Sequence, residues 1–282
     1  MSGKTLLQSD FKNKSQTQFK AKIVGIGAWG KDFRQWQDLQ NFLSDKPWED
    51  DGIKGPKPEI IPANERRRAP LPVRLAVESS WQASQASLYK PEELSCVFVS
   101  ALGDTQLTDY MCKVLAGDSK MLSPTKFHNS VHNAAAGYWT ISTGCMKAAN
   151  SVAGYEESVS LTLLEALTQI SIEQKPILIT FYDAPVSSVL KSLLKNEYPF
   201  AVSIVLAPES VDYSGTTISA VVKNEATQWP KLGTKGDRLN ELYESTPTAR
   251  VLAVLDKLRQ KSTTNLVLPL SEGTSLEIQL SS

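Results

Sequence analysis

Residues 123–167 read SPTKFHNSVHNAAAGYWTISTGCMKAANSVAGYEESVSLTLLEAL, and the rest of the sequence is interpreted from this stretch. It carries both histidines of the chain, a run of alanines followed by Gly137, and two consecutive glutamates, Glu156 and Glu157. The alanine-rich part predicts a helix over Asn129–Thr143 that packs closely against a neighbour. Asn150–Val152 predicts a short strand, after which a glycine turns the chain into a second helix.

The composition indicates a soluble globular protein. Of the 282 residues, 41% are hydrophobic and 21% are charged, which allows a full core. Thirty basic residues balance thirty acidic ones, so neither nucleic acid nor an anionic membrane is expected as a partner. Three scattered cysteines make no disulfide framework, which suits a reducing, cytoplasmic location. The polar start is unlike a signal peptide, and we expect no membrane span.

Apolar runs that predict strands alternate with segments whose apolar spacing predicts helices. The predicted strands are Phe19–Gly27, Leu94–Leu102, Pro176–Tyr182, Ala201–Ala207 and Thr217–Val222. The predicted helices are Phe33–Leu43, Arg74–Leu88, Thr105–Leu115 and Glu157–Ile170, the last with Val159, Leu163, Ala166, Leu167 and Ile170 on one face. This alternation predicts an α/β fold with a largely parallel sheet.

The chain divides into three parts. Residues 1–18 are expected to be a flexible N-terminus, residues 19–224 the main domain, and residues 225–282 a C-terminal extension packed on that same domain. The extension is marked by its polar composition after Asn224. Within it, Arg250–Leu258 predicts a short helix and Asn265–Leu280 predicts a β-hairpin.

A glycine motif lies near the start of the main domain. Gly25-Ile26-Gly27-Ala28-Trp29-Gly30 matches the G-x-G-x-x-G pattern, whose glycines let a pyrophosphate approach a helix in dinucleotide-binding folds. The acidic residue that should end a second strand about twenty residues later is missing, because that region reads as a loop. We therefore interpret the glycines as a tight strand-to-helix turn and expect no cofactor.

The two histidines, His128 and His132, are four residues apart and would share one face of a helix. HNSVH has the spacing of the H-E-x-x-H zinc site, but Asn129 occupies the place of the general base and no third ligand is apparent. We expect no metal, and we interpret these histidines as hydrogen-bonded in the core or as lining a pocket.

The three cysteines are interpreted as structural. Cys145 lies in the link between a helix and a strand, where a buried thiol accounts for it better than a reactive one. Cys96 falls within a predicted strand and Cys112 within a predicted helix, so both are expected in the core.

Two further features each leave two interpretations open. Arg66, Arg67 and Arg68 are either a solvated entrance to a helix or a docking point for an acidic partner. Glutamates at the start of a helix complement its dipole. A nucleophile elbow has the same order of strand, tight turn and reactive side chain, which would place Glu156 at the reactive position.

These segments, in their order along the chain, resemble the N-terminal half of the β-ketoacyl synthases, which have a thiolase-like fold. Five stretches over roughly residues 19–222 carry the resemblance: Ile23–Gly27 with Trp29-Gly30, Pro62-Ala63 through the arginines to Leu75-Ala76, Val99–Gly103, Ser123-Pro124 through Asn133–Gly137 to Gly144, and Val152–Glu156. The last is similar to the family's V-S-T-A-C elbow. The fold implied is one half of a β-ketoacyl synthase, followed by a helix and a hairpin.

The departures from the family concern its chemistry. The nucleophilic cysteine of the family falls on Glu156, or on Glu157 if the register differs by one, and a carboxylate cannot hold an acyl chain as a thioester. The family's later motifs, including H-G-T-G-T, follow its elbow, whereas no histidine follows His132 here. The resemblance therefore implies a chain that does not condense acyl units alone.

More narrowly, the sequence resembles the short chain-length-factor subunits of aryl polyene type II polyketide systems, through F-x-N-S-V-H-N-A-x-A-G-Y-W at Phe127–Trp139. This implies a heterodimer with a complete β-ketoacyl-acyl carrier protein synthase in polyketide or fatty-acid-like biosynthesis, with the carrier protein reached through the partner. The implied dimer interface is Asn150, Ser151 and Val152. The implied acyl-tunnel residues are Phe127, His128, Val131, His132 and Asn133, and a carrier protein would dock at Arg66, Arg67 and Arg68.

Two other functions remain as alternatives. Some synthase-like subunits that lack the cysteine decarboxylate malonyl units, and Glu156 would then take part. A negative charge beside a malonyl carboxylate is unfavourable unless one of them is protonated, which weighs against this role. The other alternative is a homodimeric scaffold or binding module without an acyl role.

Overall fold

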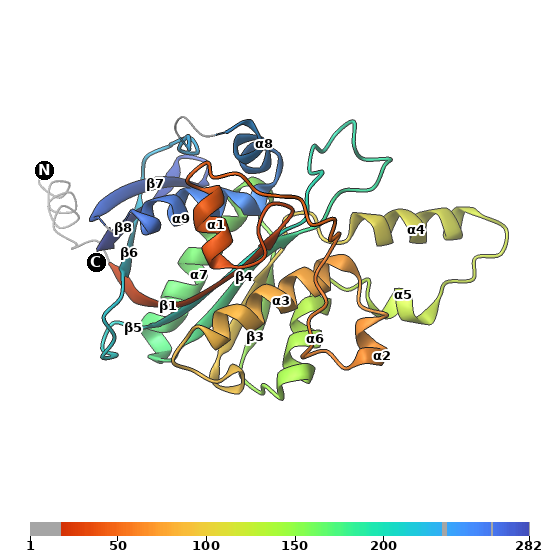
Figure 1. Cartoon of the computed structure of the whole chain (residues 1–282), viewed down its shortest axis with the longest axis horizontal. Coiled ribbons are helices and arrows are strands. Elements are labelled where there is room, and N and C mark those ends of the chain that lie inside the picture. Colours follow the sequence, from red (N-terminus) through yellow and green to blue (C-terminus); the bar gives the residue numbers. More distant parts are fainter. Residues whose placement is uncertain (1–17, 233–235, 261, 282) are drawn as a thin grey trace, which may run out of the picture.

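The computed structural model describes residues 18–232, 236–260 and 262–281, which form one eight-stranded sheet with helices on both faces (Figure 1). The order across the sheet is β3-β2-β4-β5-β1-β6-β8-β7. The strands are β1 (Phe19–Gly30), β2 (Ser95–Val99), β3 (Ala149–Val152), β4 (Ile177–Asp183), β5 (Phe200–Pro208), β6 (Thr217–Lys223), β7 (Thr264–Ser271) and β8 (Thr274–Ser281). Of the predicted flexible N-terminus, residues 1–18, the first 17 lie outside the described part of the chain.

The prediction of a largely parallel sheet is wrong. Among the described strands, the parallel pairs are β2 with β3 and β2 with β4, and the other five pairs are antiparallel. Neighbouring parallel strands need a crossover, which is usually helical. Helices separate β2 from β3 and β3 from β4, but residues 184–199 and 209–216 join the following strands without one.

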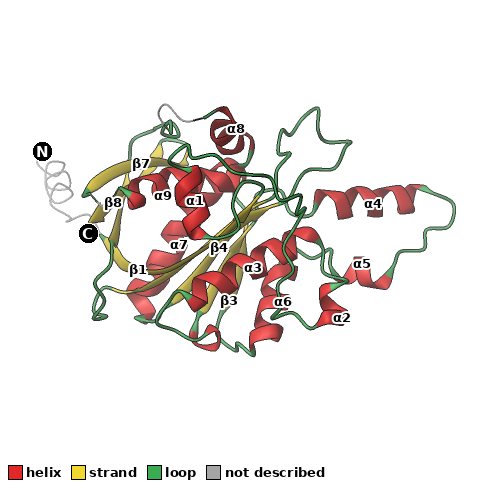
Figure 2. Ribbon diagram, in the orientation of Figure 1, coloured by secondary structure: helices red, strands yellow, loops and turns green. Residues whose placement is uncertain are grey.

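The helices form a layer on each face of the sheet (Figure 2). Helix α3 (Leu71–Gln85) and helix α6 (Ala134–Thr143) pack into one apolar cluster with alternate residues of β2 and β4. Helix α7 (Ser158–Glu173) packs into the other cluster, and the predicted apolar face of this helix is buried there as expected. The remaining helices are α1 (Trp36–Phe42), α2 (Ala63–Arg66), α4 (Thr105–Ala116), α5 (Pro124–His128), α8 (Asp237–Ser245) and α9 (Leu252–Arg259).

The glycine motif lies inside a strand, which corrects the predicted turn. Strand β1 continues to Gly30, and α3 crosses it at Gly25 and Gly27. A Cβ atom at Gly27 would lie 2.1 Å from the backbone oxygen of Ser79, and one at Gly25 would lie 2.3 Å from that of Ala83. These glycines therefore permit close packing of a helix on a strand, and the pattern has no helix N-terminus after it.

The predicted helix over Asn129–Thr143 is shorter, because only Ala134–Thr143 is helical, as α6. Helix α5 ends at His128, turns follow, and α6 begins at Ala134, so His128 and His132 do not share a helix face. Helices α4 and α5 project from the body of the molecule as an arm (Figure 1). Leu107 is the only buried residue of α4. Cys112, at the middle of this helix, is therefore exposed, which corrects its expected place in the core.

The C-terminal residues extend the main sheet. The predicted hairpin is confirmed as β7 and β8, and β8 pairs with β6 from Thr217↔Ser281 to Lys223↔Ser275. A 3-10 turn, η3 (Pro247–Val251), precedes α9 and replaces the first part of the helix predicted from Arg250. Thr248 of this turn donates a hydrogen bond to Asp183, the last residue of β4.

Candidate functional site at the carboxyl ends of the parallel strands

The three parallel strands end side by side, β3 at Val152, β2 at Val99 and β4 at Asp183. Ligands of open α/β sheets bind outside the carboxyl ends of parallel strands, where the connecting loops diverge. The segments that follow these strands contain the predicted elbow and lead to the predicted tunnel residues. The candidate site is therefore built at this edge.

Asp183, the last residue of β4, connects the segments at this edge through hydrogen bonds. Its carboxylate is fully buried and accepts hydrogen bonds from Ser100 Oγ at 2.7 Å, Thr248 Oγ1 at 2.7 Å and the Leu102 amide at 3.3 Å. Burial raises the pKa of Asp183 to about 6. The Ser100 hydroxyl in turn accepts a bond from the Gly103 amide at 2.9 Å. Sequence reasoning missed this network because the carboxylate ends an apolar strand and finds its partners far along the chain.

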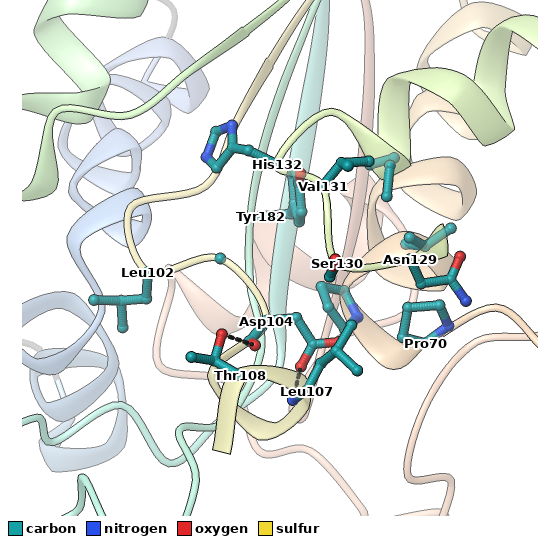
Figure 3. A pocket seen from close by; sticks show the side chains of 15 residues that line it. Pro70, Leu102, Asp104, Leu107, Thr108, Asn129, Ser130, Val131, His132 and Tyr182 are labelled. Carbon is teal, nitrogen blue, oxygen red and sulfur yellow. Dashed lines mark hydrogen bonds between the residues drawn. The ribbon is translucent and has the colours of Figure 1, made fainter. Parts of the chain in front are cut away.

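A first pocket of about 240 Å³ opens between the start of α4 and the segment 129–132 (Figure 3). Val131 and His132 line it, and His132 Nε2 lies 3.3 Å from the Ser100 carbonyl oxygen. Asp104 closes one side, where its carboxylate caps α4 by accepting a bond from the Leu107 amide at 2.9 Å. Burial raises the pKa of Asp104 above its ordinary value.

A second pocket, of about 430 Å³, is more apolar. It lies between Ile61-Pro62 and α6, and its lining includes His128, Val131, Asn133 and Ile141. Val131 therefore borders both pockets. Both histidines line a pocket as predicted, but both are exposed and neither is in the core. Phe127, on α5, is 59% exposed and lines neither pocket.

The predicted order of strand, sharp turn and helix is present after β3. Tyr155 adopts a left-handed backbone conformation with φ of 46°. The Gly154 amide donates a hydrogen bond of 3.0 Å to Ser158 Oγ, and Ser158 is the first residue of α7. The Glu156 carboxylate lies 3.5 Å from Arg250 Nη2 of η3. A left-handed turn before a helix presents a side chain at the surface, and Tyr155 is 48% exposed.

The remaining predicted site residues lie on β3, directly before the elbow, and around α2. Strand β3 lies at one edge of the sheet. Asn150 is exposed, and its side-chain amide donates a hydrogen bond of 3.2 Å to Glu165. Ser151 and Val152 are half-buried. Arg67 and Arg68 follow α2 and are exposed; Arg67 donates a hydrogen bond to Asn64, and Arg68 forms an ion pair with Glu65. Arg66 is half-buried and donates a hydrogen bond of 3.1 Å to the Pro58 carbonyl oxygen.

Comparison with known protein families identifies the domain. Residues 34–264 match the model of the beta-ketoacyl synthase N-terminal domain. The chain belongs to this family. No curated protein sequence matches it.

Solved structures with this synthase fold agree. The ketosynthase ApeO in complex with its chain length factor ApeC from Xenorhabdus doucetiae superposes with a TM-score of 0.67 at 17% identity, over 92% of this chain and 99% of that one. The ishigamide ketosynthase/chain length factor gives 0.66 at 11% identity, over 93% and 99% of the two chains. A type II polyketide complex, AntDE:AntF, gives 0.68 at 12% identity, over 94% and 99%.

The cysteines of this synthase-family chain do not lie at its elbow. Cys145 and Cys96 are buried, as expected, and each thiol lies 3.3 Å from the Leu94 carbonyl oxygen. The neighbouring Cys96 thiol lowers the pKa of Cys145 to about 6. Among the described residues, no group of three His, Cys, Asp or Glu side chains is placed to hold a metal ion. Within the same residues, no helix combines the length and the apolarity that crossing a membrane requires.

Proposed function

We propose that this chain is a non-condensing ketosynthase-like subunit, a chain length factor, that forms a heterodimer with a complete β-ketoacyl-acyl carrier protein synthase. The observation that carries the proposal is the chemistry of the elbow. Tyr155, Glu156 and Glu157 occupy the turn between β3 and α7, so this ketosynthase-family domain offers no thiol in either register. Without a thiol the elbow cannot form the acyl thioester that condensation requires.

The arm supports a role in bounding an acyl tunnel supplied by the partner. Phe127 is 59% exposed and Val131 53% exposed, so two large apolar side chains in residues 127–131 are open to solvent. We propose that the partner covers them, and that Phe127, His128, Val131, His132 and Asn133 close the far end of its tunnel. The apolar pocket of about 430 Å³ beside Val131 would then limit the length of the acyl chain that the tunnel accommodates.

The edge strand supports the proposed place of contact. Among the described strands, β3 pairs with β2 alone, so one side of its backbone is available to a second chain. We propose that Asn150, Ser151 and Val152 contribute the interface there. An acyl carrier protein would be met through the partner, with Arg66, Arg67 and Arg68 as an additional docking point, in an aryl polyene, polyketide or fatty-acid-like pathway.

The test is co-expression with the ketosynthase encoded nearest to this chain, followed by native mass spectrometry of the purified complex. A stable one-to-one heterodimer is expected. A homodimer that ignores every candidate ketosynthase would overturn the proposal and favour the scaffold alternative. Decarboxylation of malonyl-carrier protein by the isolated chain, lost in Glu156→Ala, would favour the decarboxylase alternative.

A matched pair of variants tests the tunnel role within that heterodimer. Val131→Trp fills the space between the two pockets, so the longest acyl product should become shorter. Ile172→Trp makes the same kind of change on α7, where Ile172 is 77% exposed and lines neither pocket, and should leave product length unchanged. Product lengths are measured by mass spectrometry of carrier-bound chains. Equal lengths in the two variants would contradict the tunnel role of Val131.

A further inference from the structure

An arginine of the C-terminal extension reaches the elbow. Arg250 lies in η3, and its Nη2 atom is 3.5 Å from the Glu156 carboxylate and 3.4 Å from the Glu244 carbonyl oxygen. The guanidinium carbon is 4.8 Å from the centre of the Tyr243 ring and 5.9 Å from that of Trp229. The side chain is only 14% exposed, so an aromatic and backbone enclosure surrounds a positive charge.

A charge in such an enclosure is costly unless an opposite charge accompanies it. The Arg250 Nε atom is buried and has no hydrogen-bond partner in the described structure, so the enclosure does not satisfy the guanidinium by itself. Among the described ion pairs, Glu156 is the only carboxylate that faces it. The neighbouring Glu157, only one residue away, makes no such pair with Arg250.

We infer that Glu156 is the counter-ion of Arg250, and that this pair holds the elbow against the C-terminal extension. The glutamate at the elbow then has a positional role rather than a chemical one. Glu156 also lines a cavity of about 170 Å³, together with Tyr155 of the elbow, Leu193 of the β4–β5 loop and Pro247 of η3. This inference concerns contacts within one chain and does not rest on the proposed heterodimer.

Charge-neutralising variants test the energetic side of the pair. Glu156→Gln should lower the urea midpoint and speed hydrogen exchange in residues 154–158 and 247–251 more than Glu157→Gln, which loses only the favourable interaction of its charge with the α7 dipole. The double variant Glu156→Gln with Arg250→Met should lose less unfolding free energy than the sum of the losses in the two single variants, because either change alone leaves one charge without its partner. Additive losses, or equal effects of the two glutamine variants, would overturn the inference.

A thiol reporter tests proximity and does not depend on stability. In a Cys112→Ser background, Glu156→Cys and Glu157→Cys are compared by the pH dependence of iodoacetamide labelling. Arg250 should lower the pKa of the thiol at position 156 by roughly 1 unit relative to position 157, about a tenfold change in thiolate. Adding Arg250→Met should remove that difference. Thiols that titrate alike at both positions, in variants folded by circular dichroism, would refute the pairing.

Discussion

Gly27→Ala is a direct test of how α3 is seated on β1. The added Cβ atom would lie 2.1 Å from the Ser79 carbonyl oxygen and 2.6 Å from the Ala83 amide nitrogen. Both are backbone atoms of α3, so no side-chain rotation relieves the contact. Relief requires moving the helix, which is also held by a hydrogen bond of 2.8 Å between the buried Ser79 and Ser203 hydroxyls.

The magnitude follows from three contributions. Overpacking of a rigid core costs typically 1–3 kcal/mol, and a clash with backbone this short places the cost at about 3 kcal/mol. Weakening the Ser79–Ser203 hydrogen bond adds about 1 kcal/mol. Replacing glycine by alanine in a strand returns about 1 kcal/mol of chain entropy. We therefore expect Gly27→Ala to reduce the free energy of unfolding by about 3 kcal/mol.

The assay is urea unfolding followed by circular dichroism, with Gly137→Ala as the control. Gly137 lies in α6, and apart from its two chain neighbours and the nearby backbone of its own helix, no atom lies within 4 Å of the position its Cβ would take. The same substitution there should therefore stabilise the protein by up to about 1 kcal/mol through helix propensity. If Gly27→Ala unfolds at the wild-type urea midpoint or above it, the inferred close packing of α3 on β1 is refuted.

Two further predictions concern titratable groups. Burial raises the pKa of Asp183 to about 6 from an ordinary value of 3.8, so the folded protein retains a proton that the unfolded chain releases. The free energy of unfolding should therefore fall as pH rises from about 4 to 6, and it should fall more steeply in the wild type than in Asp183→Asn. Parallel plots of the urea-derived unfolding free energy against pH for the two proteins would contradict this. Iodoacetamide should modify the exposed Cys112 before Cys96 and Cys145, because burial outweighs the low pKa of Cys145, as peptide mass mapping would show. Earlier modification of Cys145 would contradict its burial.

Local patterns predicted much of the fold. The apolar face of α7, the buried run of β4 and the hairpin of β7 and β8 depend on neighbours a few residues away, and all three are present. The thiolase-like family was also recognisable, because its motifs keep their order along the chain, and the family match confirms it. The sharp turn at Tyr155 was predictable because Gly154 stands between a strand and a helix that begins with two glutamates.

The sequence failed where the answer depended on distant partners. Repeated apolar runs do not say which strand lies beside which, so the sheet was expected to be largely parallel although five pairs are antiparallel. Cys112 lies on the amphipathic α4, which looked like a core helix until its projection from the body was known. The glycines of β1 indicate a tight strand-to-helix turn until α3 is placed across them.

The sequence by itself determined most of the elements, the family and the absence of a thiol at the elbow, since each is written in consecutive residues. Only the tertiary structure brought Arg250 to Glu156 and Thr248 to Asp183. A buried charge or carboxylate takes its partner from whatever the folded chain places within hydrogen-bond reach, and a hydrophobic pattern carries no record of that choice.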